Sequence, residues 1–223
     1  MGETHYAAVT GDLVASRKVP APSRAQIQRG TLEALEELNG ALGAVLARPA
    51  VLTAGDEIQA LLRVPSRVVG FVQVLEDRLF GAAGAEQDIA FGVGWGELST
   101  GLLSPAEGVE QLDGACFHRA REALVRAKKR KLWAVFQGFG ELEDRTLTSL
   151  FELMGAIRAG WTAKQHTHTL DLRQLGKRIA VARRRAVSPS VITESLQLSR
   201  FDAIQNGEET ARRLLARFDP SEA

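Results

Sequence analysis

The chain has 223 residues, 45% of them apolar, and a formal net charge of +1, which indicates a globular protein with one large domain or two modest ones. A net charge so close to zero excludes a global field that recruits nucleic acid or membranes, so any basic surface must be local. The single cysteine, Cys116, excludes an intrachain disulfide. No apolar run approaches the roughly 18 residues of a membrane span, and residues 1–5 lack a signal-peptide pattern. We therefore expect a cytoplasmic protein with no membrane partner.

Strands and helices alternate through the first two thirds of the sequence. Strand-like apolar runs lie at residues 6–13, 50–53, 58–64, 88–95 and 132–136. Helical periodicity lies at residues 23–42, 65–80 and 114–129. The order is βαββαβ followed by a helix and a strand, and in the split βαβ arrangement the first and third strands are adjacent and antiparallel. The glycines of the fourth strand indicate a close approach by another backbone.

Two carboxylates fall where this topology brings strand ends together. Asp12 ends the first strand and Asp56 begins the third, so we expect them to share one edge of the sheet. Close carboxylates repel unless a cation neutralises them, and Mg²⁺ takes one or two carboxylates together with water and phosphate oxygens. Arg17 and the backbone N–H groups of the turn ending at Ser16 are suited to a phosphate. The alternative is that Asp12 caps a turn and Asp56 supports a hairpin.

Four ordered segments resemble the SatD family. They are Gly-Asp-Leu-Val-Ala-Ser-Arg at residues 11–17, Gly-Asp-Glu-Ile-Gln at 55–59, Phe-Gly-Val-Gly-Trp-Gly-Glu-Leu-Ser-Thr at 91–100 and Gly-Ala-Cys-Phe-His-Arg-Ala-Arg at 114–121. The resemblance covers residues 1–137 and continues into the C-terminal part. The family name by itself implies no activity.

The same segments are more distantly similar to class III nucleotidyl cyclases and GGDEF-type diguanylate cyclases. That resemblance implies a ferredoxin-like palm in which Asp12, Asp56 and Glu57 hold the metal. It also implies that His118 and Arg121 lie beside the nucleotide, together with Ser16 and Arg17.

Three departures from the cyclase pattern lower the expected activity. Leu52 stands near the base-selecting lysine position, His118 replaces the transition-state asparagine, and Glu122 replaces the arginine one turn later. Phosphoryl chemistry depends on positioned cations, so the resemblance implies binding of Mg²⁺ and a nucleotide more than turnover.

The C-terminal third is helical, with apolar periodicity at residues 146–157, 163–175 and 202–218. Residues 181–196 resemble a helix-turn-helix, with a turn at 186–188 and a second helix whose inward-facing residues are Val191, Ile192 and Leu196. Ser188 is expected to cap that helix and Pro189 to occupy its first position. We place a domain boundary at residue 138, which separates a domain at 1–138 from a DNA-binding domain at 139–223.

The local basic surface lies in this segment. Its cations are Arg173, Lys177, Arg178, Arg183, Arg184, Arg185 and Arg200, and Glu194 is the one acid among them. The predicted DNA contacts are Arg178, Arg183, Arg184, Ser188, Ser190, Thr193 and Gln197, with Glu194 also facing the bases. The alternative is an ordinary helical hairpin with a solvated basic face. His166 and His168 have no third ligand nearby, so a structural role is favoured over a metal pair.

The sequence therefore predicts an α+β ferredoxin-like, cyclase-related domain followed by an all-α helix-turn-helix domain. The predicted function is a homodimeric DNA-binding transcriptional regulator. Its N-terminal domain binds Mg²⁺ and a nucleotide or serves as a dimerisation scaffold. One rival is a metal-dependent nucleotidyl cyclase acting on a nucleoside triphosphate. Another is a degenerate palm that binds a partner protein.

Overall fold

A five-stranded sheet forms the centre of the protein. The structure is a computed structural model that describes residues 4–13, 21–53, 56–83, 89–99 and 108–220. The strands are β1 (His5–Leu13), β2 (Leu46–Leu52), β3 (Glu57–Leu62), β4 (Ile89–Glu97) and β5 (Ala134–Gln137). Their order in the sheet is β2-β3-β1-β4-β5, and β5 pairs with β4 in parallel while the other pairs are antiparallel. The predicted adjacency of the first and third strands is confirmed.

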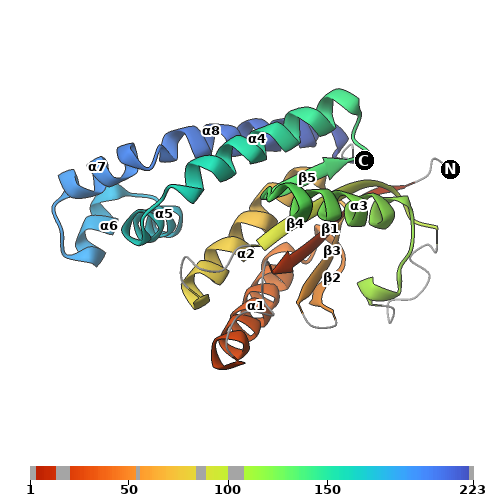
Figure 1. The fold of residues 1–223 in the computed structure, drawn as a ribbon, viewed down its shortest axis with the longest axis horizontal. Coiled ribbons are helices and arrows are strands. Elements are labelled where there is room, and N and C mark those ends of the chain that lie inside the picture. Colours follow the sequence, from red (N-terminus) through yellow and green to blue (C-terminus); the bar gives the residue numbers. More distant parts are fainter. Residues whose placement is uncertain (1–3, 14–20, 54–55, 84–88, 100–107, 221–223) are drawn as a thin grey trace.

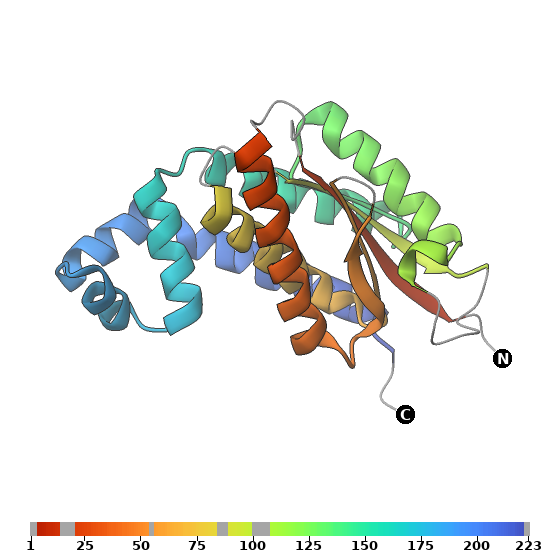
Figure 2. The ribbon, with the colours of Figure 1, turned by 90° about the horizontal axis from the view of Figure 1, so that it is seen from below.

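Helices cover both faces of the sheet (Figure 2). One face packs against α1 (Ala21–Leu42) and α2 (Val68–Ala83), and the other packs against α3 (Ala115–Arg130). The alternation of β1 sorts its side chains between the layers. Ala7 and Val9 join the core that includes the α1 and α2 residues, whereas Ala8 joins the cluster that contains Cys116 and Ala120 of α3.

The glycines of β4 allow α3 to lie directly on the sheet. A Cβ atom at Gly92 would lie 2.0 Å from the carbonyl oxygen of Ala120, and one at Gly94 would lie 2.1 Å from that of Cys116. No side chain fits at those distances, so the predicted close backbone approach is confirmed.

The second strand starts earlier than predicted. It begins at Leu46 rather than at residue 50, and its pairing with β3 has register shifts on both sides of Arg48. Pro49 has no N–H to donate, and β2 tolerates it because it is an edge strand with bulges at that point.

Two long helices extend away from the sheet and connect it to the three remaining helices (Figure 1). They are α4 (Glu141–Ala159), which follows β5, and α8 (Phe201–Leu215), which lies beside it. Three helices, here called the arm, lie at their far end: α5 (Ala163–Leu175), α6 (Arg178–Arg185) and α7 (Pro189–Leu198). Three short 3-10 helices complete the described elements: η2 (Pro65–Arg67), η4 (Val109–Gln111) and η5 (Ala216–Phe218).

The end of the chain returns to the sheet body. The Asp219 carboxylate accepts hydrogen bonds from the backbone N–H of Ser66 at 2.9 Å and from its hydroxyl at 2.6 Å. The rings of Phe136 and Phe151 lie 5.0 Å apart, and both belong to one buried cluster that runs across residue 138. The division of the chain into two domains at that residue stays a prediction.

The predicted α+β class is confirmed, with a βαββαβ ferredoxin-like unit followed by helices. Within the described ranges, none of the helices combines the length and the apolar character needed to cross a membrane.

Candidate functional site

The end of β1 and the start of β3 meet as the sequence predicts. Asp12 is the register partner of Glu57, and Asp56 precedes Glu57 in the chain. The side chains of Asp12 and Glu57 are 18% and 29% exposed. Both reach basic residues of α3, so this carboxylate edge lies under that helix.

Basic side chains of α3 neutralise the carboxylate edge. The Lys128 ammonium lies 2.7 Å from Oδ2 of Asp12, and Nη2 of Arg121 lies 3.6 Å from Oε1 of Glu57. The amide of Gln59 also donates to Glu57, at 2.8 Å. Arg121 therefore contacts a residue predicted to bind metal, and its own contact with a nucleotide stays a prediction.

Of the other predicted nucleotide contacts, the structure describes only His118. His118 lies 3.2 Å from Asp113, at the beginning of α3. Ser16 and Arg17 lie outside the described residues.

The described side chains do not fit Mg²⁺ as they lie. A divalent cation at this edge needs the Asp12 oxygen that Lys128 now contacts, and a lysine at 2.7 Å supplies the neutralising charge itself. No cluster of three or more His, Cys, Asp or Glu suited to a metal occurs in the part of the chain that the structure describes. Metal binding at Asp12, Asp56 and Glu57 stays a prediction. Lys128 was missed as the partner of Asp12, although the basic run at 128–131 was the available signal.

The second candidate site is the α6–α7 pair. A three-residue turn joins these helices, and its first residue, Ala186, has φ 53° and ψ 42°, the left-handed conformation that usually selects glycine. Val181, Ile192 and Leu196 are buried between the helices of the arm. Val191 was predicted to face inward, but it is 44% exposed because it lies on the outer side of α7.

The start of α7 differs in detail from the prediction. Ser188 occupies the N-cap position and Pro189 opens the helix, as expected, but the Ser188 side chain makes no capping hydrogen bond. Its hydroxyl lies 2.8 Å from that of Ser190 instead. Thr193 donates to the Pro189 carbonyl at 3.0 Å, while Ser190 and Gln197 are exposed.

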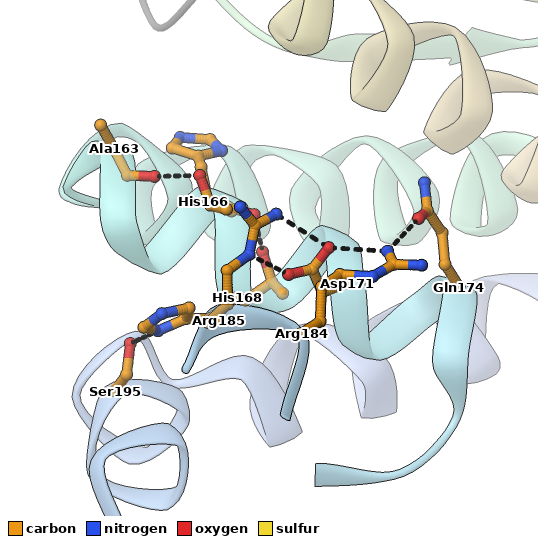
Figure 3. A network of polar contacts seen from close by, with 10 residues as sticks. Ala163, His166, His168, Asp171, Gln174, Arg184, Arg185 and Ser195 are labelled. Atoms are coloured by element: carbon orange, nitrogen blue, oxygen red, sulfur yellow. Dashed lines mark hydrogen bonds and ion pairs between the residues drawn. The ribbon is translucent and has the colours of Figure 1, made fainter. Parts of the chain in front are cut away.

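One buried carboxylate binds two of the cations assigned to the basic surface (Figure 3). Asp171 of α5 has a side chain only 2% exposed, and it accepts hydrogen bonds from both Arg184 and Arg185, each with a contact of 3.0 Å. Burial acts to raise the pKa of Asp171, but the hydrogen bonds from Arg185 and then Arg184 bring the pKa below its usual value. Arg184 therefore links α6 to α5, and its predicted contact with DNA stays a prediction.

Other cations of the segment divide into paired and unpaired sets. Arg173 donates to Glu208 at 2.6 and 3.0 Å, and Arg178 lies 3.8 Å from Asp202. The exposed cations with no ion pair among the contacts of the described residues are Lys177, Arg183 and Arg200. The positive surface is therefore smaller than the sequence suggests.

Both histidines of α5 hold structural contacts. Nδ1 of His168 lies 2.8 Å from the Ser195 hydroxyl, which links α5 to α7 (Figure 3). The His166 ring stacks on Phe80 at 4.3 Å and meets the edge of Trp161 at 4.9 Å. Burial, aided by the charge of Arg158, lowers the pKa of His166 to about 4.

The fold is that of an α+β protein with a ferredoxin-like body and a helical arm. The chain belongs to the SatD family, whose match covers residues 6–215. A search of curated proteins finds no match.

Three solved structures with similar arrangements have low sequence identity. A bacterial light-regulated adenylyl cyclase is 11% identical with a TM-score of 0.42, over 61% of this chain and 77% of that chain. The catalytic core of a rhodopsin-guanylyl cyclase with converted specificity, in complex with ATPαS, is 16% identical with a TM-score of 0.41, over 55% and 72%. A regulator of polyketide synthase expression from Bifidobacterium adolescentis is 14% identical with a TM-score of 0.26, over 98% and 86%.

Proposed function

We propose that the protein is a DNA-binding transcriptional regulator in which the α6–α7 pair reads the DNA. The body at residues 5–137 acts as a degenerate cyclase-like domain that supports the arm and mediates dimerisation. The observation that carries the proposal is a pair of helices, α6 and α7, joined by a three-residue turn at the free end of the arm, with one side of α7 exposed (Figure 1).

The local geometry supports α7 as the recognition helix. A three-residue turn and a left-handed residue at its start are the features that let the second helix of such a motif cross the first. Ser190, Glu194 and Gln197 are exposed on α7, and short polar side chains suit the base edges of a major groove. The exposed Val191 is suited to contact a thymine methyl group.

Exposed cations beside α7 supply the phosphate contacts. Lys177 and Arg183 have no ion pair among the described residues, and the 3.8 Å pair between Arg178 and Asp202 is solvent-exposed at both ends. Weak exposed pairs give way readily to a phosphate. Arg184 contributes indirectly, because its bond to Asp171 fixes the position of α6.

A selection experiment tests whether the chain reads sequence. The full chain is incubated with a pool of random duplexes, and the bound fraction is sequenced after several rounds. We expect one enriched motif, with two half-sites if the protein is a dimer. Gln197→Ala should relax the preference at one position, whereas the exposed Glu152→Ala on α4 should leave the motif unchanged. A bound pool with no enriched sequence would contradict the proposal.

A nucleotide enzyme is the second candidate, favoured by the Asp12–Glu57 pairing at the end of β1. Lys128 and Arg121 of α3 lie at this pair, so a metal would have to displace their contacts with the carboxylates. Incubation with ATP or GTP and Mg²⁺, followed by chromatography, separates the two functions. A cyclic or dinucleotide product that is lost in Asp12→Asn would favour the enzyme.

A further inference from the structure

A second basic surface lies on α3, in the body of the protein. Residues 115–131 contain seven of the 28 lysines and arginines of the chain, against one acid, Glu122. The seven are Arg119, Arg121, Arg126, Lys128, Lys129, Arg130 and Lys131. The whole chain has 27 acids, so this helix concentrates a positive charge that the net charge of the chain hides.

The partners of these cations divide them into two sets. Four are held by neighbouring elements: Lys128 by Asp12, Arg130 by Glu152, Arg121 by Glu57, and Arg119 by the Trp95 carbonyl. The Arg126 guanidinium donates to the side-chain oxygen of Gln137 at 2.6 Å, which leaves its charge in place because that acceptor is neutral. Lys129 and Lys131 have no ion pair among the contacts of the described residues. Arg126, Lys129 and Lys131, here called the α3 cations, are all exposed.

The helix dipole accounts for only part of this charge. Cations in the last turn of a helix are favoured because its carbonyl end is partly negative, and the effect falls off within that turn. Lys129 lies in the last turn of α3, but Arg126 and Arg121 lie before it. The positive surface therefore extends beyond what the end of the helix requires for its own stability.

The composition of the surface indicates the kind of partner. The buried centre of a protein–protein interface is apolar and depleted in lysine. Among the described residues of α3, Val125 is the one large apolar side chain that is exposed. Interfaces with nucleic acids are instead polar and strongly positive, because they meet a row of phosphates. The surface therefore fits a nucleic acid better than it fits a protein.

The position of the cations on the helix indicates contact with phosphates alone. A recognition helix presents residues near its N-terminus to the bases, whereas the α3 cations lie at the C-terminal end of α3. Two of the three are lysines, which act as point charges without the fixed donor geometry that distinguishes one base from another. Binding at this surface should therefore be independent of sequence.

We infer that the C-terminal end of α3 binds the phosphate backbone of a duplex nucleic acid through Arg126, Lys129 and Lys131. In both views α3 lies on the body, apart from the arm (Figure 1 and Figure 2). The contact is thus separate from α6 and α7 and goes beyond the proposed function, because the body itself then holds a duplex.

The salt dependence of non-specific binding tests this surface. The affinity of the full chain for a short duplex of arbitrary sequence, prepared as DNA and as RNA, is measured by fluorescence anisotropy at several salt concentrations. The triple variant combines Arg126→Gln, Lys129→Gln and Lys131→Gln. For at least one duplex we expect its affinity to fall at least about tenfold, and the slope of log affinity against log salt concentration to fall by about 2 to 3, one phosphate for each cation. Unchanged affinity and slope with both duplexes would overturn the inference.

A scattered variant controls for net charge. Arg29→Gln, Arg67→Gln and Arg145→Gln together remove three charges from exposed positions on α1, η2 and α4. This variant should keep the affinity and the slope of the unmodified chain. A loss equal to that of the triple variant would show that binding follows the net charge of the chain, and the inference would fail.

A charge-preserving exchange controls for disturbance of the helix. Arg126→Lys, Lys129→Arg and Lys131→Arg alter the same three side chains and keep their charge, so affinity and slope should both be retained. If this exchange binds as weakly as the triple variant, the loss does not come from the charges and the phosphate contact is refuted.

The same measurement separates this surface from the function proposed for the arm. If the triple variant weakens binding while Arg178→Ala with Arg183→Ala does not, reading by α6 and α7 fails and the α3 surface stands. The reverse pattern refutes the α3 surface and leaves the proposed function. Displacement of the duplex by poly-L-glutamate at an equal concentration of charge would assign the surface to an acidic protein and would also overturn the inference.

Discussion

Lys128 lies 2.7 Å from Asp12, at the point where Asp12 is paired in register with Glu57. The end of β1 and the start of β3 meet where the sequence predicts. The cation that lies beside Asp12 is a side chain of α3. The ferredoxin-like body therefore offsets the acidic charge at this edge of the sheet with a lysine of its own.

Removal of this lysine should expose latent metal affinity. Lys128→Met leaves Asp12 without its cation, so we expect the variant to bind Mg²⁺ at least about tenfold more tightly than the unmodified chain, by calorimetry. Its loss of stability should stay below about 1 kcal/mol because the lysine is exposed.

The neighbouring lysine provides the control. Lys129→Met removes the same charge from the same turn of α3, and it should change neither the Mg²⁺ affinity nor the stability. If the unmodified chain binds Mg²⁺ tightly and Lys128→Met binds it equally well, the Lys128–Asp12 ion pair does not compete with a metal.

The buried Asp171 carboxylate of the arm should contribute more to stability than the exposed Lys128–Asp12 ion pair. Asp171→Asn removes the negative charge and replaces one of the two acceptor oxygens by an NH₂ donor that faces an arginine, so we expect a loss of about 1–3 kcal/mol in denaturant unfolding. Asp202→Asn, an exposed acid 3.8 Å from Arg178, should change stability by less than about 0.5 kcal/mol.

The stability that Asp171 contributes to the arm should depend on pH. The pKa of Asp171 is lower in the folded chain than in the unfolded one, so the unfolded state binds the proton first as the pH falls. Its contribution is complete above about pH 4 and is lost as the pH falls through the folded pKa. The stability difference between the unmodified chain and Asp171→Asn should therefore shrink below about pH 4. A stability difference between the two proteins that stays constant down to pH 2 would argue against a role for ionised Asp171.

His166 should make the fold sensitive to milder acid. Its pKa of about 4 lies below the ordinary value of 6.5, so stability is full above pH 6.5 and falls as the pH drops through 4. After discounting for solvent screening, the loss should be roughly 1–2 kcal/mol. His166→Phe keeps a ring against Phe80 and cannot titrate, so its melting temperature should vary less between pH 7 and pH 4. An equal decline in both proteins would assign the effect to another group.

The contact between α3 and the sheet should not tolerate a methyl group. Gly94→Ala places a Cβ atom 2.1 Å from the Cys116 carbonyl, so we expect a loss of about 3 kcal/mol or more, or no folded protein. Gly70→Ala, inside α2 with open space around it, should instead gain about 0.5–1 kcal/mol. Similar melting temperatures for the two variants would contradict the packing of α3.

Patterns within single elements were readable from the sequence. The alternation of β1 and β4 and the order of the elements sufficed to bring Asp12 beside the start of β3, because the split βαβ arrangement permits only that pairing. The glycines of β4 likewise predicted a close approach by another backbone, which is that of α3.

Contacts between distant elements were not readable. Lys128 lies 116 residues from Asp12, and their contact depends on where α3 ends over the sheet. Arg184 and Arg185 looked like free cations because Asp171 lies outside the basic segment, on another helix. Val191 fits an apolar helical pattern equally well facing in or out, and only the packing of α5 against α7 decides it.

The central claim is that α6 and α7 bind DNA, and the salt dependence of binding tests it most directly. Fluorescence anisotropy with a duplex enriched by selection gives the slope of log affinity against log salt concentration. Arg178→Ala with Arg183→Ala should weaken binding and reduce that slope by about 2, one for each lost phosphate contact. The control is Arg145→Ala, an exposed arginine of α4 outside the arm, which should leave both quantities unchanged. An unaltered affinity and slope in the double variant would contradict the account.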